Sequence, residues 1–242
     1  MKWLPRFIFF LSVFLIVVNG FSSENSLYQK YDILLKRYVN SGLVDYKSLK
    51  KDRYLLDEYL KTLSNVDLNT YNKWDNHAKL AFLINFYNAA TLQLIIDNYP
   101  VKSIKDIGNI FSGPWDKKVV KLFGNKISLD NLEHDIIRKQ FNEPRIHFAL
   151  VCAAKGCPPL RFEAYTGKKL DAQLTEQVQE YLQSSYGMVV DYQKNTVFLS
   201  SIFKWYDEDF SSIDDFIKKY SLIDIKNFNK KWIKYDWSLN EK

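Results

Sequence analysis

The sequence predicts an α+β protein in which helix dominates, and three observations support this prediction. Residues 76–98 are apolar on almost every side, and residues 145–152 form a nearly continuous apolar run. In addition, two pairs of short strand-like segments are present, and within each pair the segments are joined by turn residues. We therefore expect a mainly helical single domain around a buried central helix, with one buried strand and two short β-hairpins.

The helices are predicted from the spacing of apolar residues. A stripe that recurs every three or four positions indicates a helix with one buried face, and the helix at 76–98 must end before Pro100, which cannot continue it. Helices are expected at 24–40, 48–63, 76–98, 130–139 and 170–186, with shorter turns at 104–107, near Trp205 and at 214–220.

The strands are predicted from turn chemistry and from apolar composition. Gly124-Asn125 joins 118–123 to 126–128, and Gln193-Lys194-Asn195 joins 189–192 to 196–199, so each pair should form a hairpin. The run at 145–152 has the composition of a strand that is covered on both faces.

The first twenty residues have the pattern of a secretory signal peptide. Lys2 and Arg6 precede an uncharged apolar run over 7–18, which is too short for a comfortable membrane span. We expect residues 1–20 to be removed and residues 21–242 to form one periplasmic or secreted domain without a transmembrane segment. An uncleaved N-terminal anchor is the alternative.

Composition narrows the classes of partner. Residues 1–20 contain two basic and no acidic residues, so their removal lowers the formal charge from +6 to +4. Because this small excess is spread along the chain, we expect no nucleic-acid partner. The chain has 17 Phe, 16 Tyr and 6 Trp but only 8 Gly, which argues against disorder and against a loop-rich disulfide scaffold. No motif indicates a cofactor.

Both cysteines and one of the three histidines lie close together after the predicted strand. Three interpretations of Cys152 and Cys157 remain open: a disulfide, favoured by an oxidising compartment; a thiolate nucleophile activated by histidine; and a metal site that adds His134 and His147. The metal site ranks lowest because the spacing matches no known ligand pattern.

Strand alternation decides between the histidines as partners of the thiol. If residues 145–152 form a regular strand, His147 and Cys152 point to opposite faces. His134 comes from another element and escapes this objection, so it is the preferred base. Cys157 precedes Pro158 in a loop that could reach either histidine.

The predicted helix at 130–139 supplies further candidates. Asp130 and Glu133 have the spacing of a capping box, which gives Glu133 a structural role. Adjacent helical residues do not face one another, so Asp130 or Arg138 should contact His134 rather than Glu133. A structural hydrogen bond is the commoner role for a lone helical histidine. Asp207 or Asp209 could orient a histidine, although capping of the next turn is the simpler role.

Two amides lie on one face of the central helix. Asn85 and Asn88 are three residues apart and must both be hydrogen-bonded if buried. They either hold neighbouring backbone, which is the simpler interpretation, or line a polar pocket and orient a catalytic group.

Several motifs together resemble one known family. Their order is Val44-Asp45-Tyr46, AFLINFYNA at 81–89, Trp115, LDNLEHDIIR at 129–138, RIHFALVCAAKGCPPL at 145–160 and SSIFKWYDEDF at 200–210. This set resembles the domain of unknown function 547 over nearly all of residues 21–242. The resemblance implies no established activity. The polar residues that it singles out are Asn85, Tyr87, Asn88, Glu133, His134, His147, Cys152 and Cys157.

Some members of that family resemble this chain at Cys152 but have serine in place of Cys157. The resemblance therefore favours Cys152 over Cys157 as the nucleophile and weakens an obligatory disulfide. Two functions are expected. The first is a thiol-dependent enzyme acting on an acyl or peptide bond of a small-molecule or peptide substrate, with Cys152 as nucleophile and His134, or else His147, as base. In that case Asn85 and Asn88 orient the base or stabilise an oxyanion. The second is a non-catalytic binding or scaffold protein with a Cys152–Cys157 disulfide.

Overall fold

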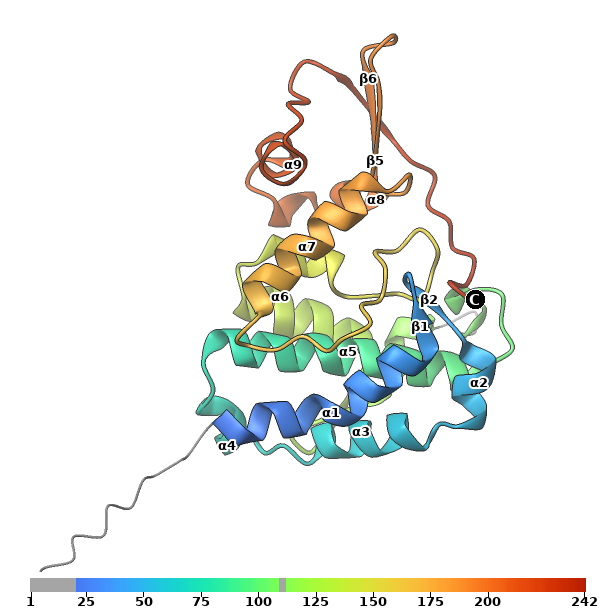
Figure 1. Ribbon diagram of the computed structural model, residues 1–242, viewed down its shortest axis with the longest axis vertical. Helices are drawn as coiled ribbons and strands as arrows, with labels where there is room; N and C mark the ends of the chain where they lie inside the picture. Colours follow the sequence, from blue (N-terminus) through green and yellow to red (C-terminus); the bar gives the residue numbers. More distant parts are fainter. Residues whose placement is uncertain (1–20, 109–111) are drawn as a thin grey trace, which may run out of the picture.

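The computed structural model describes residues 21–108 and 112–242, and helix α5 (Asn76–Asn98) lies at its centre (Figure 1). The Asp75 carboxylate caps the first turn by accepting a hydrogen bond from the amide of Ala78, and the helix ends just before Pro100. This range agrees with the prediction. The predicted signal peptide at 1–20 lies outside the described residues.

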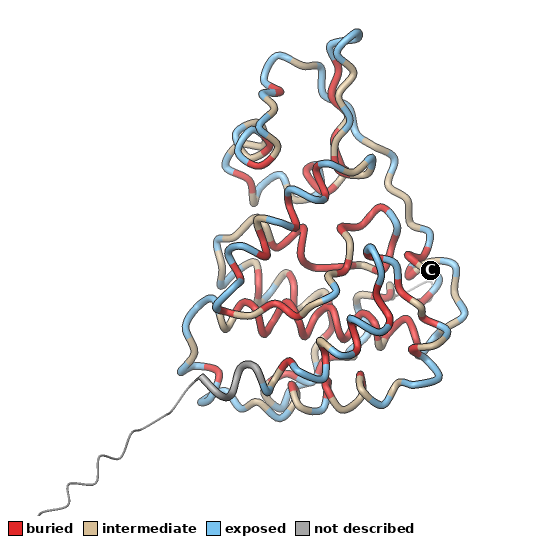
Figure 2. Tube along the Cα trace, in the orientation of Figure 1, coloured by how far each residue is buried: buried red, intermediate tan, exposed pale blue. Residues whose placement is uncertain are grey.

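Helix α5 is apolar because the rest of the protein covers it. It is long and apolar enough to cross a bilayer, but 89% of its most apolar window is buried inside the protein. Figure 2 shows α5 as a largely buried element, with segments of mixed exposure on either side of it. Burial in the core therefore accounts for its composition.

One layer against α5 consists of N-terminal helices. Helix α1 (Phe21–Tyr38) packs on α3 (Tyr54–Ser64), and the rings of Tyr31 and Tyr59 stack with centroids 4.5 Å apart. The helix predicted at 48–63 is interrupted at Asp52-Arg53, which separates α2 from α3. The other elements of this layer are β1 (Val39–Asn40), β2 (Leu43–Val44), α2 (Tyr46–Lys51) and α4 (Leu68–Asn72).

The opposite layer contains a second apolar cluster around Phe148. Its helices are α7 (Leu170–Gln183), α8 (Ser201–Trp205) and α9 (Ile213–Ser221). Strands β5 (Met188–Asp191) and β6 (Thr196–Leu199) form the second predicted hairpin, and β7 (Asn229–Trp232) adds to β6 in parallel. The hairpin is confirmed, whereas β7 was not predicted because all four of its side chains are exposed.

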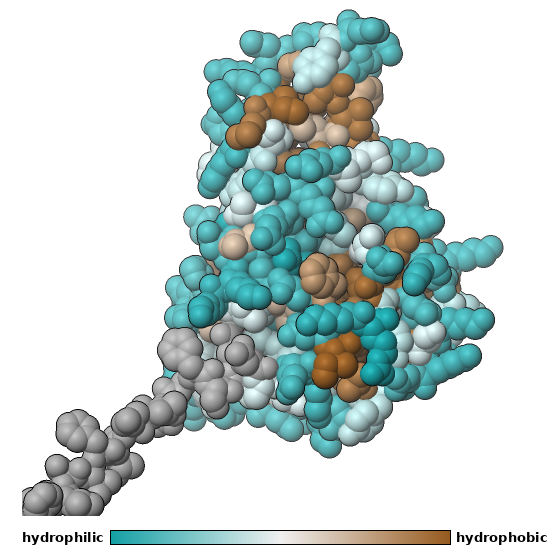
Figure 3. All heavy atoms as spheres, viewed as in Figure 1, coloured by the Kyte–Doolittle hydropathy of each residue, from teal (hydrophilic) through white to brown (hydrophobic). Residues whose placement is uncertain are grey.

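The first predicted hairpin is also confirmed, although its turn is Phe123-Gly124, one residue earlier than the predicted Gly124-Asn125. Strands β3 (Val120–Leu122) and β4 (Asn125–Ile127) pair antiparallel around Phe123-Gly124, and both turn residues have positive φ, as a two-residue hairpin turn requires. Three short 3-10 helices lie between the longer elements: η1 (Ile104–Asp106), η2 (Pro114–Asp116) and η5 (Asp207–Asp209). The face seen in Figure 3 is mostly hydrophilic, and its apolar side chains lie in small separate patches.

The prediction of a buried strand at 145–152 was wrong. A 3-10 helix, η4 (Pro144–Phe148), occupies the first part of this segment, and residues 149–152 have no regular structure. Pro144 and the Glu143 carboxylate, which accepts a hydrogen bond from the amide of Arg145, begin the turn. The segment is apolar because it passes between the two clusters, and a short apolar run alone does not distinguish strand from buried turn.

The helix predicted at 130–139 exists, but its geometry and its cap differ from the prediction. Residues Asn131–Ile137 form a π-helix, η3, which continues as the α-helical turn α6 (Arg138–Gln140). The Asp130 side chain does not cap it, so the predicted capping box was wrong. Instead, the Ser128 hydroxyl accepts a hydrogen bond from the amide of Asn131 at 3.0 Å. Wide helical turns of this kind are frequent at functional sites.

Candidate active site

A cavity of about 340 Å³ lies beside α5, where η3, the segment after η4, α8 and the C-terminal segment meet. This volume falls at the lower end of the range for small-molecule pockets. Its lining combines thiols, imidazoles, carboxylates and aromatic rings, which belong to Tyr87, Trp115, Asp116, Asp130, Glu133, His134, His147, Cys152, Cys157, Trp205, Tyr206, Tyr235 and Trp237.

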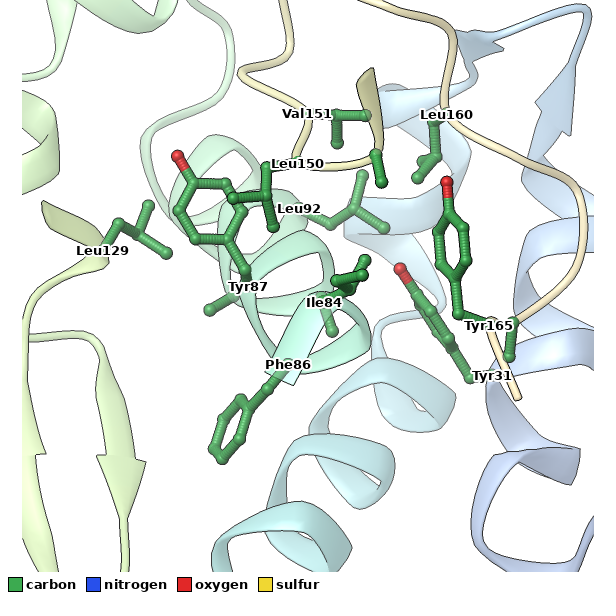
Figure 4. Packing of buried hydrophobic residues seen from close by; sticks show 14 of the residues in the cluster. Tyr31, Ile84, Phe86, Tyr87, Leu92, Leu129, Leu150, Val151, Leu160 and Tyr165 are labelled. Atoms are coloured by element: carbon green, nitrogen blue, oxygen red, sulfur yellow. The ribbon is translucent and has the colours of Figure 1, made fainter. Parts of the chain in front are cut away.

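The segment that carries Cys152 is fixed to α5 by Asn88. The Asn88 amide donates to the carbonyl of Ala149 and accepts from the amide of Val151, both at 2.9 Å. Figure 4 shows Leu150 and Val151 lying over α5, beside Tyr87 and Leu92. Because the chain is irregular here, these two hydrogen bonds replace those that a strand would have made.

The residue after Cys152 has an unusual backbone conformation. Ala153 has a φ of +58°, in the left-handed region that non-glycine residues rarely adopt. This turn lets the amide of Ala154 stabilise the Cys152 thiolate. Strain of this kind is maintained only where surrounding contacts impose it, and it is concentrated at functional sites.

The C-terminal segment supplies those contacts. The amide of Gly156 donates to the carbonyl of Asp236, and the amide of Asn240 donates to the carbonyl of Ala153. A Cβ at Gly156 would lie 2.8 Å from the backbone nitrogen of Asp236, so only glycine permits this approach. The same segment brings Tyr235 to the cavity.

The two cysteines are both free thiols in this structure. The amide of Cys152 donates to the sulfur of Cys157 at 3.0 Å, and the Cys152 sulfur lies 3.2 Å from the Tyr235 hydroxyl. A hydrogen bond from Cys157 lowers the pKa of Cys152, and the Tyr235 hydroxyl and the Ala154 amide lower it further. Burial raises the pKa of Cys157 well above its usual value. The half-buried Cys152 is therefore the thiol that ionises first.

His147 is oriented by a carboxylate. Its Nε2 lies 2.6 Å from Asp209 Oδ2, and its ring stacks on Tyr206 with centroids 3.8 Å apart. Since a carboxylate only accepts, Nε2 carries the proton and Nδ1 keeps its lone pair. Nδ1 is buried and has no hydrogen-bond partner among the described residues. Burial lowers the pKa of His147 despite the opposing effect of Asp209, so the ring is neutral near pH 7.

His134 has a different environment, and its contacts agree with the prediction. The Arg138 guanidinium donates to Nδ1 at 2.8 Å, and Nε2 lies 3.7 Å from Asp130 Oδ1. Arginine has no acceptor, so the Nδ1 lone pair is occupied and Nε2 carries the proton. Glu133 does not contact this ring; its carboxylate accepts a hydrogen bond from the Tyr206 hydroxyl at 2.7 Å.

One arginine connects the two histidines. Arg138 makes a bidentate ion pair with Asp209, with distances of 2.7 and 2.8 Å, while its third nitrogen contacts His134. Its guanidinium also lies 5.3 Å from the ring centroid of Tyr206. The carboxylate that orients His147 is therefore itself fixed by an arginine.

The structure brings most of the predicted site residues together. Cys152, Cys157, His134, His147 and Glu133 all line the cavity. The argument from strand alternation, which separated His147 from Cys152, was wrong because no strand exists there. Neither histidine forms a hydrogen bond with Cys152; within the described part of the chain, the one side-chain partner of Cys152 besides Cys157 is Tyr235.

The two helix amides serve the backbone rather than the cavity. Asn85 donates to the carbonyl of Tyr165 at 2.7 Å and accepts from its amide at 2.9 Å, as Asn88 does for the segment before Cys152. Neither amide lines the cavity. Among the described residues, no group of three or more His, Cys, Asp or Glu has the arrangement of a metal site.

The sequence patterns indicate Tyr87 and Trp115 but not the aromatic residues in the last part of the chain. Tyr206 is contained in the motif at 200–210 without a predicted role, and no motif includes Tyr235 or Trp237. Tyr235 lies 83 positions after Cys152 and shares no local pattern with it. Asp209 was identified as a residue that could orient a histidine, and the structure pairs it with His147.

Comparison with known proteins gives a match to one family but no function. No curated protein and no solved structure matches the chain. The match to the family extends from helix α4 into α7, a narrower range than the motif order suggested, and includes both histidines and both cysteines of the cavity. Residues 71–182 match the family described as protein of unknown function, DUF547, which confirms the resemblance found in the sequence.

Proposed function

We propose that this protein is a thiol-dependent enzyme that acts on an acyl or peptide bond, with Cys152 as the nucleophile. The observation that carries the proposal is the position of the Cys152 thiol: it lines a cavity, contacts the Tyr235 hydroxyl and has Cys157 as a second donor. A thiolate is the reactive form of cysteine, and neighbouring donors stabilise it.

The hydrogen bonds favour His147 over His134 as the acid–base group. His147 has a free lone pair on Nδ1 and a carboxylate on Nε2, which is the arrangement of a base held in one tautomer. In His134 the lone pair is occupied by Arg138, so this ring serves as a donor through Nε2.

The proposed step begins when the Cys152 thiolate attacks the substrate carbonyl carbon. A carbon–sulfur bond forms, the carbonyl electron pair moves to oxygen, and the donors of the thiolate, Tyr235 and the Ala154 amide, are placed to stabilise that oxyanion. When the thiolate forms, the Cys152 thiol proton passes through solvent to Nδ1 of His147. The bond to the leaving group then breaks, and the leaving alcohol or amine takes this proton from His147. Water, deprotonated by His147, attacks the thioester and releases the acid and the thiolate.

We also propose that the protein acts outside the cytoplasm, because residues 1–20 have the pattern of a signal peptide. Because an oxidising compartment favours disulfides, the proposal depends on Cys152 and Cys157 remaining free thiols there. A stable Cys152–Cys157 disulfide in the purified mature protein would instead support the alternative, a non-catalytic binding or scaffold protein.

The test is site-specific alkylation of the purified native protein. Iodoacetamide should modify Cys152 with a pH midpoint below that of a free thiol, and peptide mapping should find Cys157 unmodified until the protein unfolds. An activity-based thiol probe should label the wild type but not Cys152→Ala, whereas Cys157→Ser should still be labelled. Preferential modification of Cys157, or no reactive thiol at all, would contradict the proposal.

A further inference from the structure

Three carboxylates around the cavity lack a cationic partner. Glu133 accepts from the Tyr206 hydroxyl, and Asp116 accepts from the amide of Gly113 at 2.7 Å. Among the described residues, the one basic group within 4 Å of the Asp130 carboxylate is the His134 ring, at 3.7 Å. Within residues 21–108 and 112–242, none of the three pairs with a lysine or arginine. The cavity therefore has acidic groups that the described chain itself does not neutralise.

Elsewhere, three partly buried carboxylates are paired with arginine. Asp209 binds Arg138, Glu143 binds Arg145, and the carboxylate of residue 163 binds Arg161. Glu133 is more buried than any of these acids, with only 6% of the residue exposed. A buried carboxylate without a cation is costly, so its retention at a cavity wall indicates that a cation arrives from outside.

Besides the carboxylates, three tryptophan rings line the cavity. Trp205 and Trp237 stack with centroids 5.8 Å apart, and Trp115 meets Trp237 edge-on at 5.9 Å. The Lys105 ammonium lies 3.7 Å from the ring centroid of Trp237, so this aromatic group already binds one cation of the chain. Trp205 is 47% exposed and leaves ring surface accessible.

We propose that the cavity recognises a substrate through a positively charged ammonium group, held between the tryptophan faces and the carboxylates. The proposal rests on the function proposed above and adds a substrate class to it: an amide or ester that carries an amine or a quaternary ammonium. No lysine or arginine lines the cavity among the described residues, so the carboxylates of its wall would repel an anionic substrate.

Calorimetric titration with choline and with its neutral isostere, 3,3-dimethylbutan-1-ol, tests the proposal. The two probes have nearly the same shape and differ in charge. Choline should bind about tenfold more tightly, and its affinity should fall as salt is added. Equal affinity for the two probes, or no detectable binding of choline, would overturn the proposal.

Two pairs of variants locate the binding. Asp130→Asn, at a half-exposed side chain, and Trp205→Leu, at an exposed one, should weaken choline binding about two- to fivefold. Their matched controls, Asp171→Asn and Trp232→Leu, are exposed outside the cavity and should leave it unchanged. Equal weakening by a variant and its control would place the cation elsewhere and contradict the proposal.

Choline binding does not require a reactive thiol, so the choline titration and the alkylation of Cys152 have independent outcomes. If alkylation shows Cys152 to be inert while choline still binds, the enzymatic function is wrong and cation recognition stands. If Cys152 is reactive and choline does not slow its alkylation more than the neutral isostere does, the thiol enzyme stands and the ammonium class is wrong.

Discussion

Replacing Asn88 with alanine should destabilise the protein and disturb the thiol loop. The substitution removes two buried hydrogen bonds of 2.9 Å, to the carbonyl of Ala149 and from the amide of Val151. A buried backbone group left without a partner costs about 1–3 kcal/mol, so Asn88→Ala should lose about 2–6 kcal/mol. That is a large fraction of the stability of a typical domain, which is about 5–15 kcal/mol.

Asn85→Ala is a matched control. It lies on the same face of α5, is equally buried and makes the same pair of hydrogen bonds, but to Tyr165. The two variants should lose similar stability in urea-induced unfolding. Only Asn88→Ala releases the segment that leads into Cys152, so only this variant should change the alkylation rate of Cys152 under conditions where both are folded.

Two results would refute this reasoning. A loss below about 1 kcal/mol for Asn88→Ala would show that the hydrogen bonds are replaced by water or by rearrangement. Normal stability combined with complete loss of thiol reactivity would show that Asn88 acts in catalysis, as the sequence also allowed, and not as a backbone clamp.

Three further substitutions test the remaining contacts. Cys157→Ala removes the main donor to the Cys152 thiolate, so the pH midpoint of Cys152 alkylation should rise; an unchanged midpoint would exclude that donor. Burial holds the pKa of His147 in the folded protein below its usual value. As the pH falls below about 6.5, His147 is therefore protonated in the unfolded chain before it is protonated in the folded protein. Urea unfolding should therefore show that the wild type loses more stability than His147→Gln between about pH 7 and pH 5, and parallel losses would contradict the assignment. Gly156→Ala would place a Cβ 2.8 Å from the backbone of the C-terminal segment, so this variant should have a lower Tm than the wild type. The control Gly113→Ala, whose Cβ would have its nearest contact at 3.6 Å, should keep the wild-type Tm. Equal Tm values for the two variants would show that the C-terminal segment adjusts to the extra methyl group.

Local pattern was sufficient to predict the helices and hairpins. The range of α5 and the positions of both hairpins follow from apolar spacing, from Pro100 and from the turn residues around Gly124, all of which act over a few positions. The same reasoning failed at residues 145–152. That segment is apolar because it lies between two packed clusters, and this long-range cause leaves the same local signal as a strand.

The site could be predicted only in part for the same reason. The cysteines and histidines were recognisable because such residues are rare in this chain, and Asp209 was recognisable as a carboxylate available to a histidine. The pairings depend on tertiary structure: Asp209 lies 62 positions from His147, and Tyr235 lies 83 positions from Cys152. The preference for His134 as the base depended on a strand that does not form.

Acylation of Cys152 tests the central claim most directly. The native protein is mixed with p-nitrophenyl acetate, quenched in acid and analysed by peptide mass spectrometry, with Cys152→Ala and the urea-unfolded wild type as controls. The account predicts an acetyl thioester on Cys152 that forms faster in the native than in the unfolded protein and that native protein then hydrolyses. Acylation of Cys157 instead, or a rate at Cys152 no greater than in the unfolded chain, would contradict it.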